Sequence, residues 1–165
     1  MGIRLLLGST IGLCCWLSSI AQAGDFQLKD MQGHEQHLSA YQGKWVLVNF
    51  WATWCSPCLN EIPALNRLLD THQNLAVIGI VMQSGSAAKI KEFAAAHQMR
   101  YPIVMGTRAV AAQVRASTGS DSELEVLPTS LLFGPKGELV YEQVGEITEL
   151  AVAKLLTAKG TSLPR

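Results

Sequence analysis

Two cysteines three positions apart, Cys55 and Cys58, stand shortly after a short apolar run. The run extends from Val46 to Phe50 and is rich in residues that favour β-strands, which predicts a buried central strand. Pro57 stands between Cys55 and Cys58 and suits the first position of a helix, because its missing N–H would have no partner there. We therefore expect a strand followed by a helix, with Cys55 at the helix N-terminus and Cys58 in the first turn.

This placement predicts redox chemistry at the cysteine pair. The free N–H groups and the positive end of the helix dipole favour a thiolate over a thiol. A purely structural disulfide is a weaker alternative, because a bridge over such a short loop removes little entropy from the unfolded chain. A zinc site is weaker still, because it needs two more ligands. No other cysteine lies outside residues 1–23, and the histidines are scattered along the chain at His34, His37, His72 and His97.

The motif around the cysteines resembles that of the thioredoxin superfamily. W-C-S-P-C occupies positions 54–58, Glu61 and Pro63 follow it, and V-L-P-T stands far downstream at 126–129. The resemblance covers Gly24 to Lys159 and is stronger to the exported, reductase-like branch that contains the cytochrome-c-maturation and TlpA/ResA-type proteins. It implies an α/β, thioredoxin-like fold, in which a central mixed β-sheet is flanked by helices. An N-terminal hairpin and a central inserted αβ element complete that fold.

Hydrophobic periodicity along the chain agrees with this architecture. Residues 25–43 suggest the hairpin, and an unbroken apolar run at 75–81 suggests a parallel strand covered on both faces. The inserted element is expected as a helix over 87–97, a strand over 103–105 and a helix over 108–117. A strand at 130–133, a turn at 134–137 and a strand at 138–144 form a second hairpin. Thr148 is suited to cap a last helix that runs to about Lys159.

Three residues are candidates for the catalytic work. Cys55 is expected to attack the substrate disulfide, and Cys58 is expected to resolve the mixed disulfide, because a residue one turn into a helix is more easily buried. Glu61 lies three positions after Cys58 on the same helical face, among leucines, so its pKa should rise toward neutrality. The resemblance also places a glutamate here, whereas the buried aspartate of thioredoxin is replaced by Asn49, which cannot take a proton. The alternative for Glu61 is an ordinary solvated acidic residue near a helix N-terminus.

Three further residues are candidates for substrate binding. Trp54 precedes the first cysteine, and it serves either as a substrate contact or as packing at the rim of the site. Pro128 resembles the family's cis-proline opposite the cysteines, although a proline before a strand is often only a breaker. A cis bond would turn the backbone of Leu127 outward, where an extended substrate could pair with it like an added strand.

The N-terminus has the features of a cleaved export signal. Arg4 precedes an uncharged stretch from Leu5 to Ile20, and the small residues Ala21 and Ala23 predict cleavage after Ala23. We therefore expect a signal peptide over 1–23, a single thioredoxin-like domain over 24–165 and a periplasmic protein. An uncleaved anchor is less favoured because the run is short for a spanning helix. A lipoprotein at Cys14 or Cys15 is disfavoured because Leu13 and Cys14 stand where a lipoprotein motif needs a small residue just before the cysteine.

The predicted activity is that of an extracytoplasmic thiol-disulfide oxidoreductase acting as a disulfide reductase. No cofactor or metal is implied, because the thiols carry the electrons. The expected partners are disulfide-bearing proteins, with apocytochromes c as candidates, and a membrane thiol donor; a monomer is expected. The formal charge of zero gives no indication of nucleic acid binding. The alternatives are a disulfide oxidant or isomerase with the same site and a non-redox module that binds cysteine-bearing chains. Peroxidase chemistry is disfavoured because the P-x-x-x-T-x-x-C context of that related family is absent.

Overall fold

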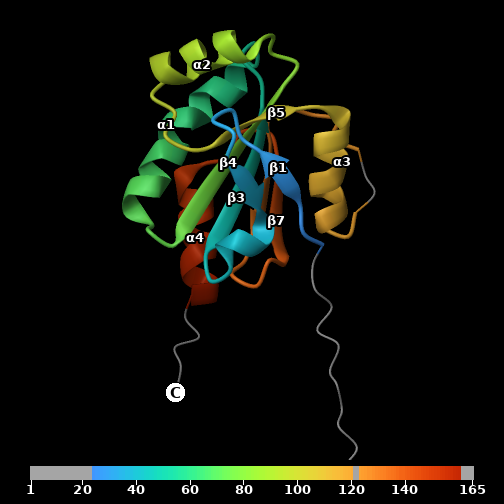
Figure 1. Ribbon diagram of the computed structural model, residues 1–165. Coiled ribbons are helices and arrows are strands. Elements are labelled where there is room, and N and C mark those ends of the chain that lie inside the picture. The colour runs from blue at the N-terminus through green and yellow to red at the C-terminus, as the bar shows by residue number, and fades with distance from the viewer. Residues whose placement is uncertain (1–23, 121–122, 161–165) are drawn as a thin grey trace, which may run out of the picture.

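A computed structural model describes residues 24–120 and 123–160, and its elements occur in the predicted order (Figure 1). These elements are β1 (Gln27–Lys29), β2 (Glu35–His37), the 3-10 helix η1 (Leu38–Tyr41), β3 (Trp45–Trp51), α1 (Ser56–Thr71), β4 (Leu75–Met82), α2 (Ala87–Ala96), β5 (Ile103–Gly106), α3 (Arg108–Ser117), β6 (Thr129–Phe133), β7 (Leu139–Val144) and α4 (Glu149–Gly160).

The central sheet is mixed, as predicted. Its five strands lie in the order β5-β4-β3-β6-β7, so the strand that leads to the cysteines is in the middle. β3 runs parallel to β4 and antiparallel to β6, and β6 forms an antiparallel hairpin with β7. Every residue of β3 is buried, which explains why its sequence is apolar except at Asn49.

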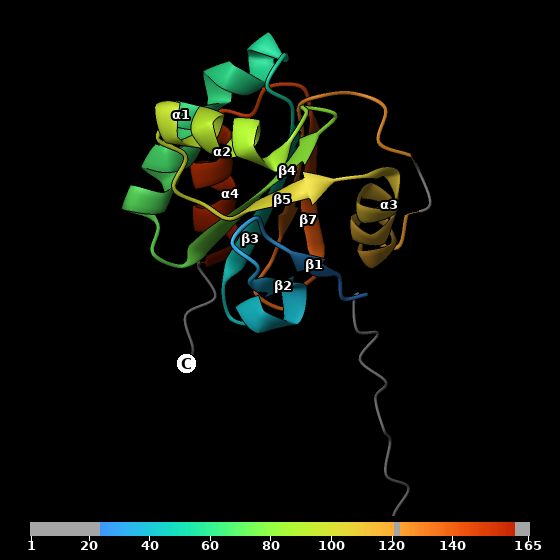
Figure 2. The same cartoon turned by 45° about the horizontal axis from the view of Figure 1, so that its top comes forward.

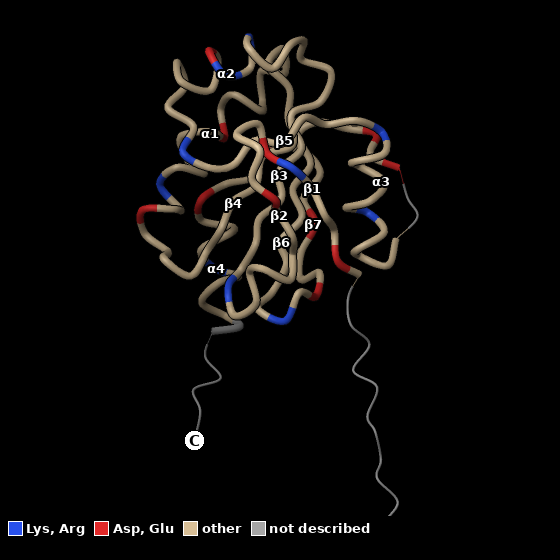
Figure 3. The backbone as a smooth tube through the Cα atoms, in the orientation of Figure 1, with Lys and Arg blue, Asp and Glu red and all other residues tan. Residues whose placement is uncertain are grey.

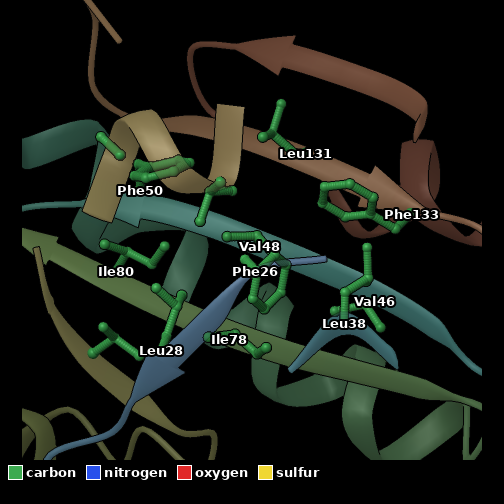
Figure 4. Close-up of a cluster of buried hydrophobic side chains, with 13 residues drawn as sticks. Phe26, Leu28, Leu38, Val46, Val48, Phe50, Ile78, Ile80, Leu131 and Phe133 are labelled. Atoms are coloured by element: carbon green, nitrogen blue, oxygen red, sulfur yellow. The ribbon is translucent and has the colours of Figure 1, made fainter. Parts of the chain in front are cut away.

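Helices cover both faces of this sheet. α1 and α4 lie on one face, whereas α3, η1 and the β1-β2 hairpin lie on the other (Figures 1 and 2). Side chains of β3 alternate between the faces, so Val46 and Val48 enter one core and Leu47 enters the other. Figure 4 shows the first of these cores, where Phe26 from the N-terminal segment lies above the strands.

The predicted N-terminal hairpin is present and packs on the sheet. Leu28 of β1 pairs with Gln36 of β2 in antiparallel register. The ring of Phe26 meets that of Phe133 edge-on, with 6.2 Å between their centroids. The hairpin therefore closes a core that the sheet alone would leave open to water.

The inserted element after β4 is also confirmed, with α2, β5 and α3 at the predicted positions. Ser86 and Thr107 cap the two helices through their side-chain oxygens, which explains where α2 and α3 begin. β5 extends the sheet beside β4, and the Phe93 ring of α2 stacks on Trp51 at 5.6 Å. The insertion thus covers the end of the sheet from which the cysteine segment leaves.

The last helix begins as predicted, because the Thr148 hydroxyl accepts a hydrogen bond from Ala151 N at 3.2 Å. Basic and acidic residues are scattered along the tube in Figure 3. Of the helices within residues 24–120 and 123–160, none has the length and apolar character needed to cross a bilayer.

Candidate functional site: a cysteine pair and a buried carboxyl group

The cysteine pair lies where β3 passes into α1. Cys55 is the N-cap of the helix, Cys58 is in its first turn, and their sulfurs form a disulfide with 2.03 Å between them. Pro57 occupies the second helical position rather than the first, because Ser56 begins the helix. The missing N–H of a proline is tolerated throughout the first turn, so the shift does not change the argument.

The two cysteines differ in access to solvent. Cys58 is fully buried, whereas Cys55 is 6% exposed. Trp51, Ala52 and the half-buried Leu127 pack in the cluster that contains both sulfurs. Cys55 is therefore the more accessible of the two cysteines, although it is more buried than a helix terminus alone suggests.

Glu61 lies on the buried face of α1 and is 1% exposed. Its Oε1 accepts a hydrogen bond from Asn49 Nδ2 at 2.7 Å, and its Oε2 accepts one from the backbone N–H of Ile147 at 3.0 Å. Asn49 also donates to Ser130 Oγ at 3.0 Å. The Glu61 carboxyl group thus links α1 to β3 and to the segment before α4, and through Asn49 to β6. Helical periodicity alone does not reveal these links.

Burial raises the pKa of the Glu61 carboxyl group to about 7. The hydrogen bonds from Ile147 and Asn49 oppose this rise because they stabilise the ionised form, and the negative charge of Glu146 adds to it. The carboxyl group therefore exchanges protons near neutral pH, and it does so one helical turn from Cys58. The leucine-rich helical face predicted that the Glu61 carboxyl group would be removed from water, and the structure confirms this burial.

Of the other three predicted site residues, Trp54 precedes Cys55 in the chain, Leu127 packs against the cysteine cluster, and Pro128 follows Leu127. Trp54 is 62% exposed, and its indole N–H donates to the carbonyl oxygen of Gln83 at 3.0 Å. The bond between Leu127 and Pro128 is cis, as predicted. The carbonyl oxygen of Pro128 accepts a hydrogen bond from Gly145 N at 2.8 Å, so this turn is anchored to the end of β7.

Sequence reasoning did not find every residue of the site. It noted that Asn49 cannot titrate, but it did not foresee that this amide would hold Glu61. Ser130 and Ile147 were missed because their contacts depend on strand register and on the chain path before α4. A polar residue inside an otherwise apolar strand was the one available signal, since a buried amide needs a partner. The histidine pair His34 and His37 forms no group of three potential metal ligands within the described part of the chain.

A thioredoxin-like sheet with a cysteine pair at a helix N-terminus defines a thiol-disulfide oxidoreductase, and the comparisons agree. Residues 21–142 match the model of the AhpC/TSA family. The thioredoxin-like protein YneN of Bacillus subtilis (strain 168) is 33% identical over 131 residues, which are 78% of this chain and 72% of YneN. The thiol-disulfide oxidoreductase ResA of Geobacillus kaustophilus (strain HTA426) is 32% identical over 128 residues, which are 77% of this chain and 70% of ResA.

A solved structure supports the same fold. The thioredoxin-family thiol:disulfide interchange protein of Chlorobium tepidum TLS superposes with a TM-score of 0.72 at 23% identity, over 83% of this chain and 94% of that chain. The chain belongs to the AhpC/TSA family and has a thioredoxin-like fold. Its activity is that of a thiol-disulfide oxidoreductase.

Proposed function

We propose that the protein is an exported disulfide reductase that exchanges with protein substrates through Cys55 and Cys58. The observation that carries this proposal is the disulfide between the N-cap and the first turn of α1, where Cys55 is 6% exposed and Cys58 is fully buried. In the reduced protein, the Cys55 thiolate attacks a substrate disulfide, forms a mixed disulfide and releases one substrate thiol. Cys58 then attacks Cys55 Sγ, and the second substrate thiol leaves as the protein disulfide forms.

Glu61 is the proton acceptor in this scheme. Cys58 must lose its proton before it can attack, and a carboxylate with a pKa near 7 can take that proton at neutral pH. Asn49 and Ile147 hold both carboxyl oxygens, so the acceptor stays in place while the disulfide opens. The general base therefore comes from the helix that carries the cysteines.

Trp54, Leu127 and Pro128 are proposed to bind the substrate. The exposed indole of Trp54 is fixed by Gln83, so it offers a rigid apolar surface next to Cys55. Leu127 packs against the cysteine cluster, and its backbone can pair with an extended chain. The substrates are then extended, disulfide-bearing protein segments, and the resemblance suggests the C-x-x-C segments of apocytochromes c.

The direction of electron flow distinguishes the reductase from an oxidant with the same residues. We expect the Cys55–Cys58 pair, equilibrated with glutathione buffers, to have a reducing potential. The reduction potential of thioredoxin is about −270 mV, and that of a strong disulfide-forming protein is about −120 mV. A potential close to the latter would overturn the reductase assignment in favour of an oxidant, because about 30 mV corresponds to a tenfold change in the equilibrium constant. A reductase also needs renewed electrons, for which we propose a membrane thiol donor.

Peroxidase activity is not part of the proposal, although the family model is named for AhpC and TSA. Val48 and Ala52 occupy the positions of Pro and Thr in the P-x-x-x-T-x-x-C context, counted back from Cys55. The curated relatives are named as oxidoreductases of thiols and disulfides.

Export to the periplasm is proposed from the N-terminal sequence, which lies outside the described residues. We expect the mature protein isolated from its native host to begin at Gly24, because Ala21 and Ala23 satisfy the preference of signal peptidase for small residues. The intact mass measures this directly. A chain that begins at Met1 and sediments with membranes would indicate an anchor, and a lipid-modified cysteine at position 14 or 15 would indicate a lipoprotein.

A further inference from the structure

The turn that follows β4 holds the short segment that leads to Cys55. The indole N–H of Trp54 donates a hydrogen bond to the carbonyl oxygen of Gln83 at 3.0 Å. The backbone N–H of Thr53 donates one to the hydroxyl oxygen of Ser84 at 2.9 Å. Two adjacent residues of one turn therefore bond the two residues that directly precede the attacking cysteine.

The bond to Thr53 links the two central strands beyond the end of their pairing. The last register pair between β3 and β4 is Trp51 with Val81, so the partly buried N–H of Thr53 lies past the ladder and needs another partner. The Ser84 hydroxyl accepts from this N–H and donates to the carbonyl oxygen of Met82, at the end of β4, at 2.8 Å. One side chain thus ties the start of the active-site turn to the neighbouring strand.

Gln83 has a backbone conformation that its residue type rarely adopts. Its φ is 45°, in the left-handed region, where a Cβ atom crowds the carbonyl oxygen that follows it. Such conformations persist where surrounding contacts hold them, and they cluster at functional sites. In this turn, the contacts that hold the conformation are the bonds to Trp54 and Thr53.

Trp54 gains a fixed orientation from this turn. Its side chain is 62% exposed, so the bond from its indole N–H to Gln83 holds a ring that is largely surrounded by water. Ordering one mobile side chain when a partner binds weakens affinity by about two- to tenfold. An indole that is already held avoids this loss when a substrate docks on it.

We propose that Ser84 and Gln83 are positioning residues of the substrate-binding surface, which hold Trp54 and the backbone at Thr53 in the arrangement that an extended protein substrate needs beside Cys55. This inference rests on the proposed reductase function and on the proposed substrate contact of Trp54. It implies a division between substrates. A disulfide-bearing polypeptide uses the held indole, whereas a small disulfide needs only the sulfur of Cys55.

The test compares Ser84→Ala with the parent on two substrates. One is an oxidised peptide that contains a C-x-x-C disulfide between apolar residues, and the other is the small molecule bis(hydroxyethyl) disulfide. We expect Ser84→Ala to raise KM for the peptide by about fivefold, with kcat within about twofold, because an unheld indole must be ordered on binding. The rate with the small disulfide should stay unchanged. Ser84→Thr keeps the hydroxyl and should restore the KM of the parent.

Ser86→Ala is the matched control. Its hydroxyl lies in the same connection between β4 and α2, but it caps α2 by accepting from Lys89 N at 3.5 Å. Loss of this cap should lower the Tm and leave KM for the peptide unchanged. An equal rise of KM in Ser86→Ala and Ser84→Ala would overturn the positioning role, because general loosening of the connection would then explain both.

Nitrogen-15 relaxation of the Trp54 indole N–H gives a second readout without any substrate. We expect an order parameter near that of rigid backbone, about 0.85, in the parent and in Ser86→Ala, and a value below about 0.6 in Ser84→Ala. Equal mobility of the indole in the parent and in Ser84→Ala would overturn the proposal. A parent that reduces neither disulfide would refute the proposed reductase itself, whereas an active parent with an unchanged peptide KM in Ser84→Ala would overturn the positioning role alone.

Discussion

Replacing Cys55 with Ser is expected to abolish thiol-disulfide exchange, with no turnover above the uncatalysed thiol reaction. A serine hydroxyl does not ionise near neutral pH and cannot form a disulfide with the substrate. Cys58 cannot replace the lost thiol, because it is fully buried behind the helix N-terminus. The measurement is the initial rate of reduction of a disulfide-bearing protein, with the variant pre-reduced and its folding checked by thermal unfolding.

Cys58→Ser is the matched control for this prediction. It keeps the attacking thiol but removes the resolving one, so mixed disulfides with substrate should accumulate and be visible on a non-reducing gel. Differential alkylation of the reduced parent should likewise label Cys55 before Cys58, since only Cys55 has an opening to solvent. Absence of reductase activity in the parent, with equal binding of cysteine-bearing chains by the parent and by Cys55→Ser, would show that the protein is a non-redox binding module. Faster labelling of Cys58 would reverse the two roles.

Glu61→Gln is expected to slow resolution of the mixed disulfide by roughly 100-fold at neutral pH, the lower end of what a general base contributes. In the parent, the resolution rate should rise with pH through about 7, where the Glu61 carboxyl group ionises. Glutamine accepts no proton, so this inflection should disappear from the variant. Stopped-flow measurement of substrate release between about pH 5 and 9 records both effects.

Glu146→Gln is a suitable control because it removes a neighbouring charge and keeps the base. The negative charge of Glu146 raises the pKa of Glu61, so its loss should move the inflection to slightly lower pH while the maximal rate is retained. A pH–rate profile of Glu61→Gln that superimposes on that of the parent would refute the role of Glu61.

The raised pKa of Glu61 also predicts that the free energy of unfolding falls as the pH rises toward neutrality. The folded protein holds the Glu61 proton up to about pH 7, whereas the ordinary value is 4.5. The folded state therefore binds more protons in this window, so the contribution of Glu61 to stability is present below 4.5 and is lost as the pH rises to about 7. Glu61→Gln should lack this loss, which chemical denaturation at several pH values will show.

The sequence by itself determined the local structure of the redox centre. A strand-forming run, a cysteine pair with Pro57 and a leucine-rich helical face are enough to place Cys55 at a helix N-terminus and Glu61 on the face of Cys58. These features follow from backbone preferences that act over a few residues, so residues that are close together in the sequence are enough to predict them. The hairpin, the inserted element and the last helix cap followed from the same kind of signal.

The surroundings of the carboxyl group were decided only by the tertiary structure. Asn49 meets Ser130 across 81 residues of sequence, and Ile147 meets Glu61 across 86. Such contacts depend on the register of β3 with β4 and β6, and a shift by one residue would turn Asn49 to the opposite face. Burial by the packed helices and strands, rather than any local motif, is what raises the pKa of Glu61 to about 7. The sequence identified the reacting groups, and their proton chemistry was set by which distant segments pack around them.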